Sequence, residues 1–116
     1  MSSTDRVAAI RKIDNNVARA AADMLDFFDR YDAQKYGSEG APLHDPCTIA
    51  FLLKPELFKM KACACQVETN SELTRGHTAV DFWHVTDQQP NIHWAYDVDR
   101  EGFFDLLEQR LSLYDH

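Results

Sequence analysis

Apolar residues near the start of the chain recur at helical spacing. The pattern over residues 7–13 predicts a first helix, with Ser3 or Thr4 as its N-cap. The polar run at 14–16 then interrupts the pattern, and because Asp and Asn favour caps over helix interiors, we expect a break there. A second amphipathic helix is predicted over about 17–31.

The next segment combines a loop with a third helix. Residues 32–43 are rich in Gly and polar side chains, which predicts a loop. Asp45 followed by Pro46 is typical of a helix start, with Asp45 as N-cap and Pro46 as the first helical residue. The Lys-Pro pair at 54–55 ends this helix, because a residue before proline avoids the helical region. One short helical turn is expected over 55–58.

In the second half of the chain, the spacing of apolar residues changes from helical to alternating. Alternating and β-branched stretches predict three strands, at 61–67, 78–83 and 92–98. Asp99 is placed to cap a closing helix, whose apolar residues follow helical spacing over 103–114. Helices followed by a small antiparallel sheet and a C-terminal helix make the predicted fold class α+β.

Composition and charge argue against several classes of function. The chain has 116 residues, which fits one domain, and 12 Lys+Arg against 19 Asp+Glu give a net charge of −7. No basic cluster is present, so we expect no nucleic-acid binding. The longest apolar run, 49–53, is too short to span a membrane, and the N-terminus resembles no signal peptide. Three cysteines form no disulfide framework, which favours a reduced, cytoplasmic setting.

The best candidate for chemistry is the pair His44-Asp45, which follows the Gly-containing loop at a helix start. A carboxylate there can bind a hard cation such as Ca²⁺, and an imidazole beside it can donate a proton near neutral pH. The structural alternative is that Asp45 only caps the helix and His44 is a surface residue.

Two further candidates are weaker. Cys63 and Cys65 with His77 could bind zinc, but the Cys-x-Cys spacing is tighter than usual, and small buried thiols explain the residues better. Asp97 and Asp99 could form a metal pair, although a strand position and a helix cap account for them as well.

Several separated segments resemble one known family. The string Gly-Ala-Pro-Leu-His-Asp-Pro-Cys-Thr-Ile-Ala at 40–50 is similar to the C-terminal part of the inosine-uridine-preferring nucleoside hydrolases, closest to the pyrimidine-specific branch. The resemblance continues in the same order through almost the whole chain, at residues 52–58, 67–69, 73–81 and 97–107.

The resemblance implies an activity and roles for three residues. The family hydrolyses the N-glycosidic bond of ribonucleosides to ribose and a free base, with a Ca²⁺ ion that holds the ribose hydroxyls and the attacking water. By match to the family motif, Asp45 is a Ca²⁺ ligand, and His44 faces the base and helps it to leave. Tyr36 lies where the family places an aromatic residue that closes over the base.

One departure from the family is large. The aspartate motif DxDxxxDD, which supplies most Ca²⁺ ligands and the base that activates water, does not occur in these 116 residues. Asp45 alone offers at most two of the six to eight oxygens that Ca²⁺ requires. We therefore expect residues 1–116 to be the C-terminal part of a nucleoside hydrolase domain, truncated before its parallel-sheet half, with weak Ca²⁺ binding and no activity alone.

The alternative is a non-catalytic binding or oligomerisation module derived from the same fold. If the rest of the domain is absent, apolar side chains such as Leu52 and Leu53 should be exposed. Large exposed apolar patches usually have partners, so this alternative predicts a homo-oligomer or a complex.

Overall fold

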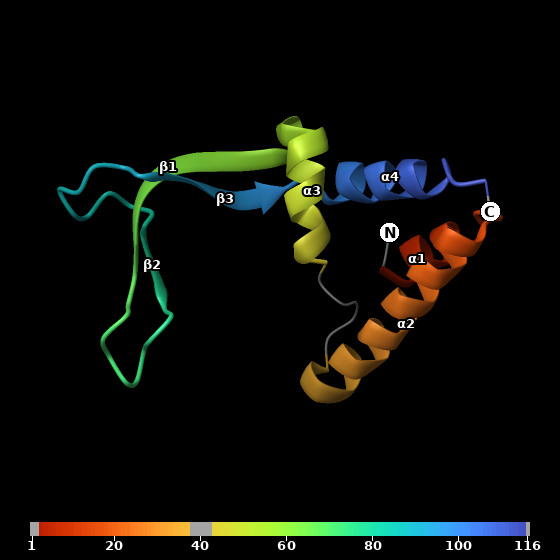
Figure 1. Ribbon diagram of the computed structural model, residues 1–116, viewed down its shortest axis with the longest axis horizontal. Helices are drawn as coiled ribbons and strands as arrows, with labels where there is room; N and C mark the ends of the chain where they lie inside the picture. Colours follow the sequence, from red (N-terminus) through yellow and green to blue (C-terminus); the bar gives the residue numbers. More distant parts are fainter. Residues whose placement is uncertain (1–2, 38–42, 116) are drawn as a thin grey trace. The chain divides into compact units, whose positions relative to one another are not determined.

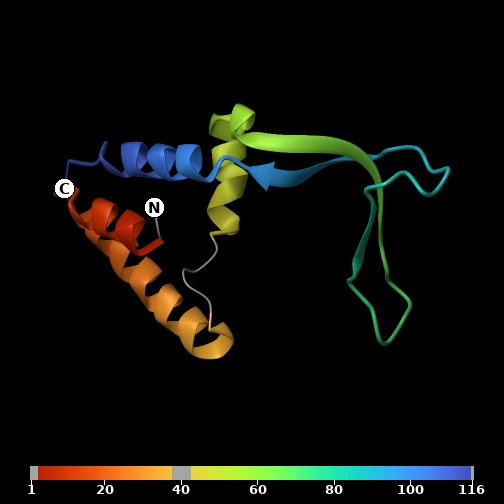
Figure 2. The ribbon, with the colours of Figure 1, turned by 180° about the vertical axis from the view of Figure 1, so that it is seen from behind.

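The computed structural model describes residues 3–37 and 43–115, and the chain divides into two compact units (Figure 1). One unit is helical and contains the chain up to Leu57 and from Asp99 onward. The other, Phe58–Val98, is a sheet with its connecting loops. The helical unit contains α1 (Ser3–Arg11), α2 (Asn16–Tyr36), α3 (Asp45–Leu53), the 3₁₀ turn η1 (Pro55–Leu57) and α4 (Arg100–Leu111) (Figure 2).

The core of the helical unit forms where α1 crosses the first half of α2. Ile10 of α1 is fully buried, and it packs with Val7 against Ala18 and Ala22 of α2. The small alanines let the two helix backbones approach closely, and burial of Ile10 contributes about 1.5–3 kcal/mol. Partly buried side chains complete this cluster: Ile13, Ala21, Leu25, Leu107 and Leu111.

Asn15 fixes the break between the first two helices. Its side-chain oxygen accepts a hydrogen bond of 2.7 Å from the backbone N–H of Ala18, which caps α2. Its amide nitrogen donates to the carbonyl of Leu111 at 2.9 Å. The predicted break at 14–16 is confirmed, and the same residue also holds the end of α4.

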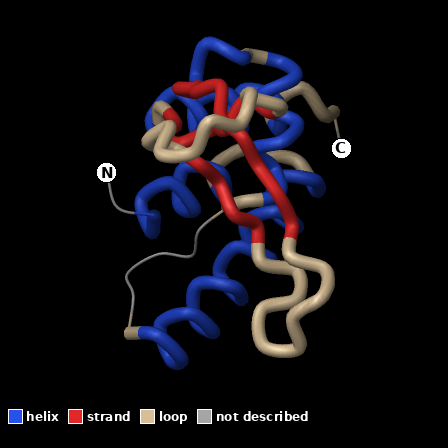
Figure 3. Tube along the Cα trace, turned by 90° about the vertical axis from the view of Figure 1, so that its left-hand side faces the viewer, coloured by secondary structure: helices blue, strands red, loops and turns tan. Residues whose placement is uncertain are grey.

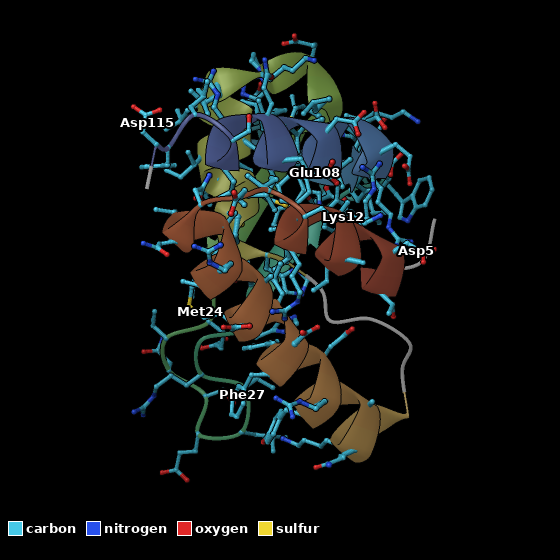
Figure 4. All side chains as sticks on the ribbon, turned by 90° about the vertical axis from the view of Figure 1, so that its right-hand side faces the viewer. Asp5, Lys12, Met24, Phe27, Glu108 and Asp115 are labelled. Carbon is cyan, nitrogen blue, oxygen red and sulfur yellow. The ribbon has the colours of Figure 1, made fainter. Side chains whose placement is uncertain are left out.

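Arg6 joins α1 to α4 through three carboxylates. Its guanidinium donates to Asp105 at 2.9 Å, to Glu108 at 3.1 Å and also to Glu101. The Arg6 side chain is only 6% exposed, and the hydrogen bond with Asp105 is the main cause that raises the pKa of this group above its usual value. Figure 4 shows α4, with Glu108 labelled, beside α1. This cluster holds the N-terminal helix on the C-terminal one.

Gly102 lets η1 pack against the start of α4. A Cβ at this position would lie 2.6 Å from a methyl carbon of Leu57, which is buried. The backbone N–H of Asp99 donates to the carbonyl of Leu57 at 2.7 Å, and the Asp99 side chain caps α4 through the N–H of Gly102 at 3.1 Å. The predicted cap at Asp99 is therefore confirmed.

The sheet unit has three antiparallel strands, drawn in red in Figure 3: β1 (Phe58–Val67), β2 (Thr78–Asp81) and β3 (Ile92–Val98). Their order in the sheet is β2-β1-β3. Cys65 of β1 pairs with Val80 of β2, and Cys63 pairs with Ile92 of β3. A bulge between Lys59 and Met60 shifts the register of the second pairing.

The α+β fold class is confirmed, and several boundaries differ from the prediction. The helix α1 already includes Ser3 and Thr4, so the prediction that one of them is its N-cap was wrong. The helices α1 and α4 end at Arg11 and Leu111, two and three residues before their predicted ends.

Residues 32–36 were expected in a loop, but α2 continues to Tyr36 and ends at Gly37, whose φ of 64° suits a glycine C-cap. β1 begins at Phe58, directly after the 3₁₀ turn. β2 ends at Asp81, because this carboxylate turns the chain. Within the described ranges, no helix has the length and apolar character needed to cross a membrane.

We predict that Arg6→Ala lowers the free energy of unfolding by about 2 kcal/mol, because hydrogen bonds between charged groups typically contribute 1.5–3 kcal/mol. Arg19→Ala is the matched control. This arginine is half exposed and pairs with the almost fully exposed Asp14, so its loss should cost less than about 0.5 kcal/mol. Urea unfolding measures both variants, and equal losses would contradict the structural role of Arg6.

A second prediction concerns the turn after β2. Hydrogen bonds from the Thr86 hydroxyl and from the backbone N–H groups of Thr86 and Val85 lower the pKa of Asp81 below its usual value of 3.8. A lowered pKa means that the ionised form stabilises this turn, and that the stabilisation is lost as pH falls through the folded-state pKa. The Val85 amide NMR signal should titrate with a midpoint below 3.8 and should not titrate in Asp81→Asn. A midpoint at or above 3.8 would show that these bonds do not form.

Candidate functional site

His44 and Asp45 lie at the start of α3 in the helical unit. His44 occupies the N-cap position but makes no side-chain capping bond, and its carbonyl accepts from the Cys47 N–H at 3.0 Å. Asp45 is the first helical residue, so the prediction that it is the N-cap was wrong by one position. Pro46 sits in the first turn, where its missing N–H costs nothing, and this shifts the cap back to His44.

Both side chains are exposed and available for chemistry. In the described part of the chain, no hydrogen bond or ion pair engages the Asp45 carboxylate or the His44 imidazole. The Thr48 hydroxyl donates to the Asp45 backbone carbonyl at 2.7 Å, which steadies the first turn without using the carboxylate. The carboxylate lies at the helix N-terminus, where the helix dipole favours negative charge. Asp45 therefore makes no side-chain capping bond but can stabilise the helix through its dipole, and His44 is a surface residue, as the structural alternative expects.

An apolar groove begins beside Asp45. It has a volume of about 450 Å³ and lies between α3 and α4 of the same unit. The α3 side of the groove carries Ile49 and Leu53, which are 59% and 49% exposed. The remaining lining residues are Pro46, Ala50, Phe103, Leu106, Leu107 and Arg110. The candidate site thus combines the polar residues His44 and Asp45 at the start of α3 with an adjacent apolar groove.

Cys47 lies in the first turn of α3 and adds no reactive group. Its Sγ donates to the carbonyl of Leu43 at 3.1 Å. Partial burial raises the pKa of the Cys47 thiol, so the sulfur stays protonated at neutral pH. A protonated thiol is a poor nucleophile and a poor metal ligand.

The described residues do not by themselves fit a calcium ion. Asp45 supplies at most two oxygens, whereas Ca²⁺ takes six to eight. Across residues 3–37 and 43–115, no group of three or more His, Cys, Asp or Glu side chains is placed to hold a metal. Further oxygen donors are therefore needed for a calcium site at Asp45.

Tyr36 is placed differently from its expected position. It is the last residue of α2 rather than part of a loop. Its side chain lies outside the described residues, as do residues 38–42 of the predicted loop. Its role against a nucleobase stays a prediction.

The residues of the two weaker metal candidates either form other interactions or do not come together as a metal site. Cys63 is buried and Cys65 half-buried, and no described metal-binding group joins them to His77. Asp97 pairs with Lys59 at 3.0 Å, and this lysine is the main cause that lowers the pKa of Asp97. Asp99 serves as the helix cap described above.

Sequence reasoning found the exposed apolar side chains of α3 but missed the groove. Leu52 and Leu53 are 75% and 49% exposed, which confirms that prediction. The four-residue spacing of Ile49 and Leu53 was visible in the sequence and marks one helix face. Their pairing with Phe103 of α4 was not visible, because it depends on contacts between segments far apart in the chain.

Comparisons with known proteins place this chain among the nucleoside hydrolases. The sequence profile described as inosine-uridine preferring nucleoside hydrolase matches residues 1–105, and the chain belongs to this family. The pyrimidine-specific ribonucleoside hydrolase RihA of Klebsiella pneumoniae is 50% identical over 109 residues, which cover 93% of this chain and 35% of that protein. RihA of Shigella boydii is 51% identical over 105 residues, 90% of this chain and 34% of that protein.

Solved structures of nucleoside hydrolases contain the same fold. A purine-preferring ribonucleoside hydrolase from Gardnerella vaginalis superposes with a TM-score of 0.75 at 26% identity, over 95% of this chain and 35% of that one. A plant nucleoside hydrolase gives a TM-score of 0.78 over 97% of this chain and 37% of that one, and at 24% identity it supports the fold alone. The chain therefore spans about a third of the length of its relatives.

We predict that the 116-residue chain shows no saturable Ca²⁺ binding at micromolar to low millimolar concentrations, because Asp45 lacks partner oxygens. Isothermal titration with CaCl₂ should give the same flat response for the parent chain and for Asp45→Asn. Micromolar binding that disappears in Asp45→Asn would contradict this reading of the site.

Proposed function

We propose that this chain forms the leaving-group side of the active site of a Ca²⁺-dependent ribonucleoside hydrolase. The observation that carries the proposal is the exposed His44-Asp45 pair at the start of α3, in a chain of the nucleoside hydrolase family. Both side chains are free of capping bonds and of described ion pairs, which leaves them available to a ligand.

His44 is suited to protonate the departing base. Cleavage of an N-glycosidic bond passes through an oxocarbenium-like transition state, in which negative charge develops on the leaving group. An imidazolium can transfer its proton to the base as the bond breaks and become neutral imidazole. A general acid of this kind contributes about 10²–10⁴-fold to the rate.

Asp45 is proposed as one ligand of the calcium ion. When bound in a complete site, the ion orients the substrate and polarises the attacking water. The donors among the described residues do not complete its shell, so further oxygens, from substrate, water and other residues, are needed. Because Asp45 and His44 are neighbours at the start of α3, the proposed metal ligand lies beside the residue proposed to face the base.

Three finer proposals follow from the same family membership. Tyr36 closes over the base, as the family resemblance implies. The substrates are pyrimidine ribonucleosides, a proposal supported by the 50% identity to proteins named pyrimidine-specific RihA. The setting is cytoplasmic, which is consistent with three cysteines that form no disulfide in the structure.

A second candidate function is a non-catalytic binding module. It is supported by a stripe of exposed apolar residues along α2, formed by Met24, Phe27, Phe28 and Tyr31, each more than half exposed. Figure 4 labels Met24 and Phe27 of this stripe. These residues lie at helical spacing, on a different side of α2 from the alanines that pack on α1. Such a stripe usually has a partner, whether or not the chain takes part in catalysis.

The test replaces the matching 109 residues of Klebsiella pneumoniae RihA by this chain and measures ribose release from uridine and cytidine. The chimera should be active, whereas the 116-residue chain alone should release no ribose. His44→Ala in the chimera should lower kcat by about 10²–10⁴-fold. With p-nitrophenyl riboside, whose phenolate leaves without a proton, the loss should be far smaller.

His93→Ala is the matched control, because this imidazole is exposed on β3 and has no assigned role. It should leave ribose release unchanged. Turnover by the isolated chain would refute the prediction of inactivity. An equal loss for both substrates in His44→Ala would refute its role as general acid.

A further inference from the structure

Three successive carbonyl groups at the start of α3 each accept a hydrogen bond from Cys47 or Thr48. The Sγ of Cys47 donates to the carbonyl of Leu43 at 3.1 Å, and the backbone N–H of Cys47 donates to the carbonyl of His44 at 3.0 Å. The Thr48 hydroxyl donates to the carbonyl of Asp45 at 2.7 Å. Two residues in the first turn of the helix therefore hold the backbone that carries the candidate site.

These bonds act on both sides of His44. The carbonyl of Leu43 belongs to the peptide plane before His44, and the carbonyl of His44 belongs to the plane after it. The orientation of these two planes defines φ and ψ of His44, which are the only soft backbone dihedrals of a residue. The direction in which the imidazole leaves the backbone follows from these angles, so it depends on the two bonds that Cys47 donates.

His44 depends on this support because its own side chain provides none. An N-cap residue usually has an extended backbone and a side-chain capping bond. His44 instead has a φ of −86° and a ψ of −54°, in the helical region, and makes no side-chain capping bond. Its imidazole is exposed and joins no hydrogen bond or ion pair within the described ranges of the chain.

The thiol of Cys47 also replaces a donor that Pro46 lacks. Proline has no N–H, so Pro46 cannot donate to the carbonyl of Leu43 three residues before it. The Cys47 Sγ donates to this carbonyl instead. Partial burial raises the pKa of the Cys47 thiol, which therefore keeps its proton and remains a donor at neutral pH.

We propose that Cys47 and Thr48 are positioning residues, which hold the first turn of α3 so that the His44 imidazole meets the departing base in the productive geometry. The effect on catalysis rests on the proposed function, whereas the effect on the turn does not. Position matters at such a site, because a displacement of about 1 Å can lower a rate by about 100-fold.

The first experiment introduces Cys47→Ala together with Thr48→Val into the RihA chimera, which removes both side-chain donors. The kcat for uridine should fall about 10-fold, and the loss for p-nitrophenyl riboside should be far smaller, because only uridine needs the proton of His44. Cys47→Ser together with Thr48→Ser keeps a hydroxyl donor at both positions and should retain the parent kcat.

Ser112→Ala is the matched control. The Ser112 hydroxyl donates to the carbonyl of Gln109 at 2.7 Å, so it makes the same kind of bond at the end of α4, outside the candidate site. Its loss should leave the kcat for both substrates unchanged. An equal loss for both substrates in the chimera with Cys47→Ala and Thr48→Val, or a loss that the two serines do not prevent, overturns the proposal.

Amide hydrogen exchange in the 116-residue chain tests the turn without any activity. After correction for intrinsic rates, the N–H of residue 47 should exchange about 10-fold faster with Cys47→Ala and Thr48→Val, and at the parent rate with the two serines. Unchanged exchange in the first variant overturns the proposal. Faster exchange there, combined with a parent chimera that releases no ribose, supports the hold on the turn and counts against the proposed function alone.

Discussion

The helical unit depends on one buried charge that three carboxylates share. Arg6 is almost fully buried and bonds Asp105, Glu108 and Glu101 of α4, so the first helix of the chain is fixed to the last. A buried arginine without these partners would carry a large desolvation cost, which makes this arrangement of α1 on α4 the favoured one. Because α4 also forms one wall of the groove beside Asp45, the cluster positions the surface on which the candidate site lies.

The helical unit buries apolar side chains on one side of α2 and leaves others exposed on another side. α2 buries its alanine face against α1, while its stripe of exposed apolar residues has no counterpart among the described residues. A helix that is apolar on two sides is typical of a position enclosed by protein on both. The same holds for α3, whose Ile49 and Leu53 face an unfilled groove. Both features agree with a fold that recurs within chains about three times as long.

Local chemistry made most elements predictable. Asn15 and Asp99 are caps whose side chains bond the backbone as the sequence indicated, and the alternating residues of β3 gave its bounds. The end of α2 could not be predicted from 32–36, since polar residues suit a helix surface as well as a loop. Arg6 and the groove escaped prediction for another reason, because both depend on contacts between segments far apart in the chain. For the site, the sequence placed His44 and Asp45 side by side, but only the structure shows that neither side chain is used for capping.

The central claim is that His44 faces a ribonucleoside base at a site to which Asp45 contributes one metal ligand. The most direct measurement follows the His44 imidazole by NMR in the RihA chimera while a non-hydrolysable ribonucleoside analogue is added, with and without Ca²⁺. The account predicts that the His44 signals shift on addition of the analogue only when Ca²⁺ is present, and that Asp45→Asn removes the shift. His44 signals that stay unchanged in a chimera saturated with the analogue would contradict it.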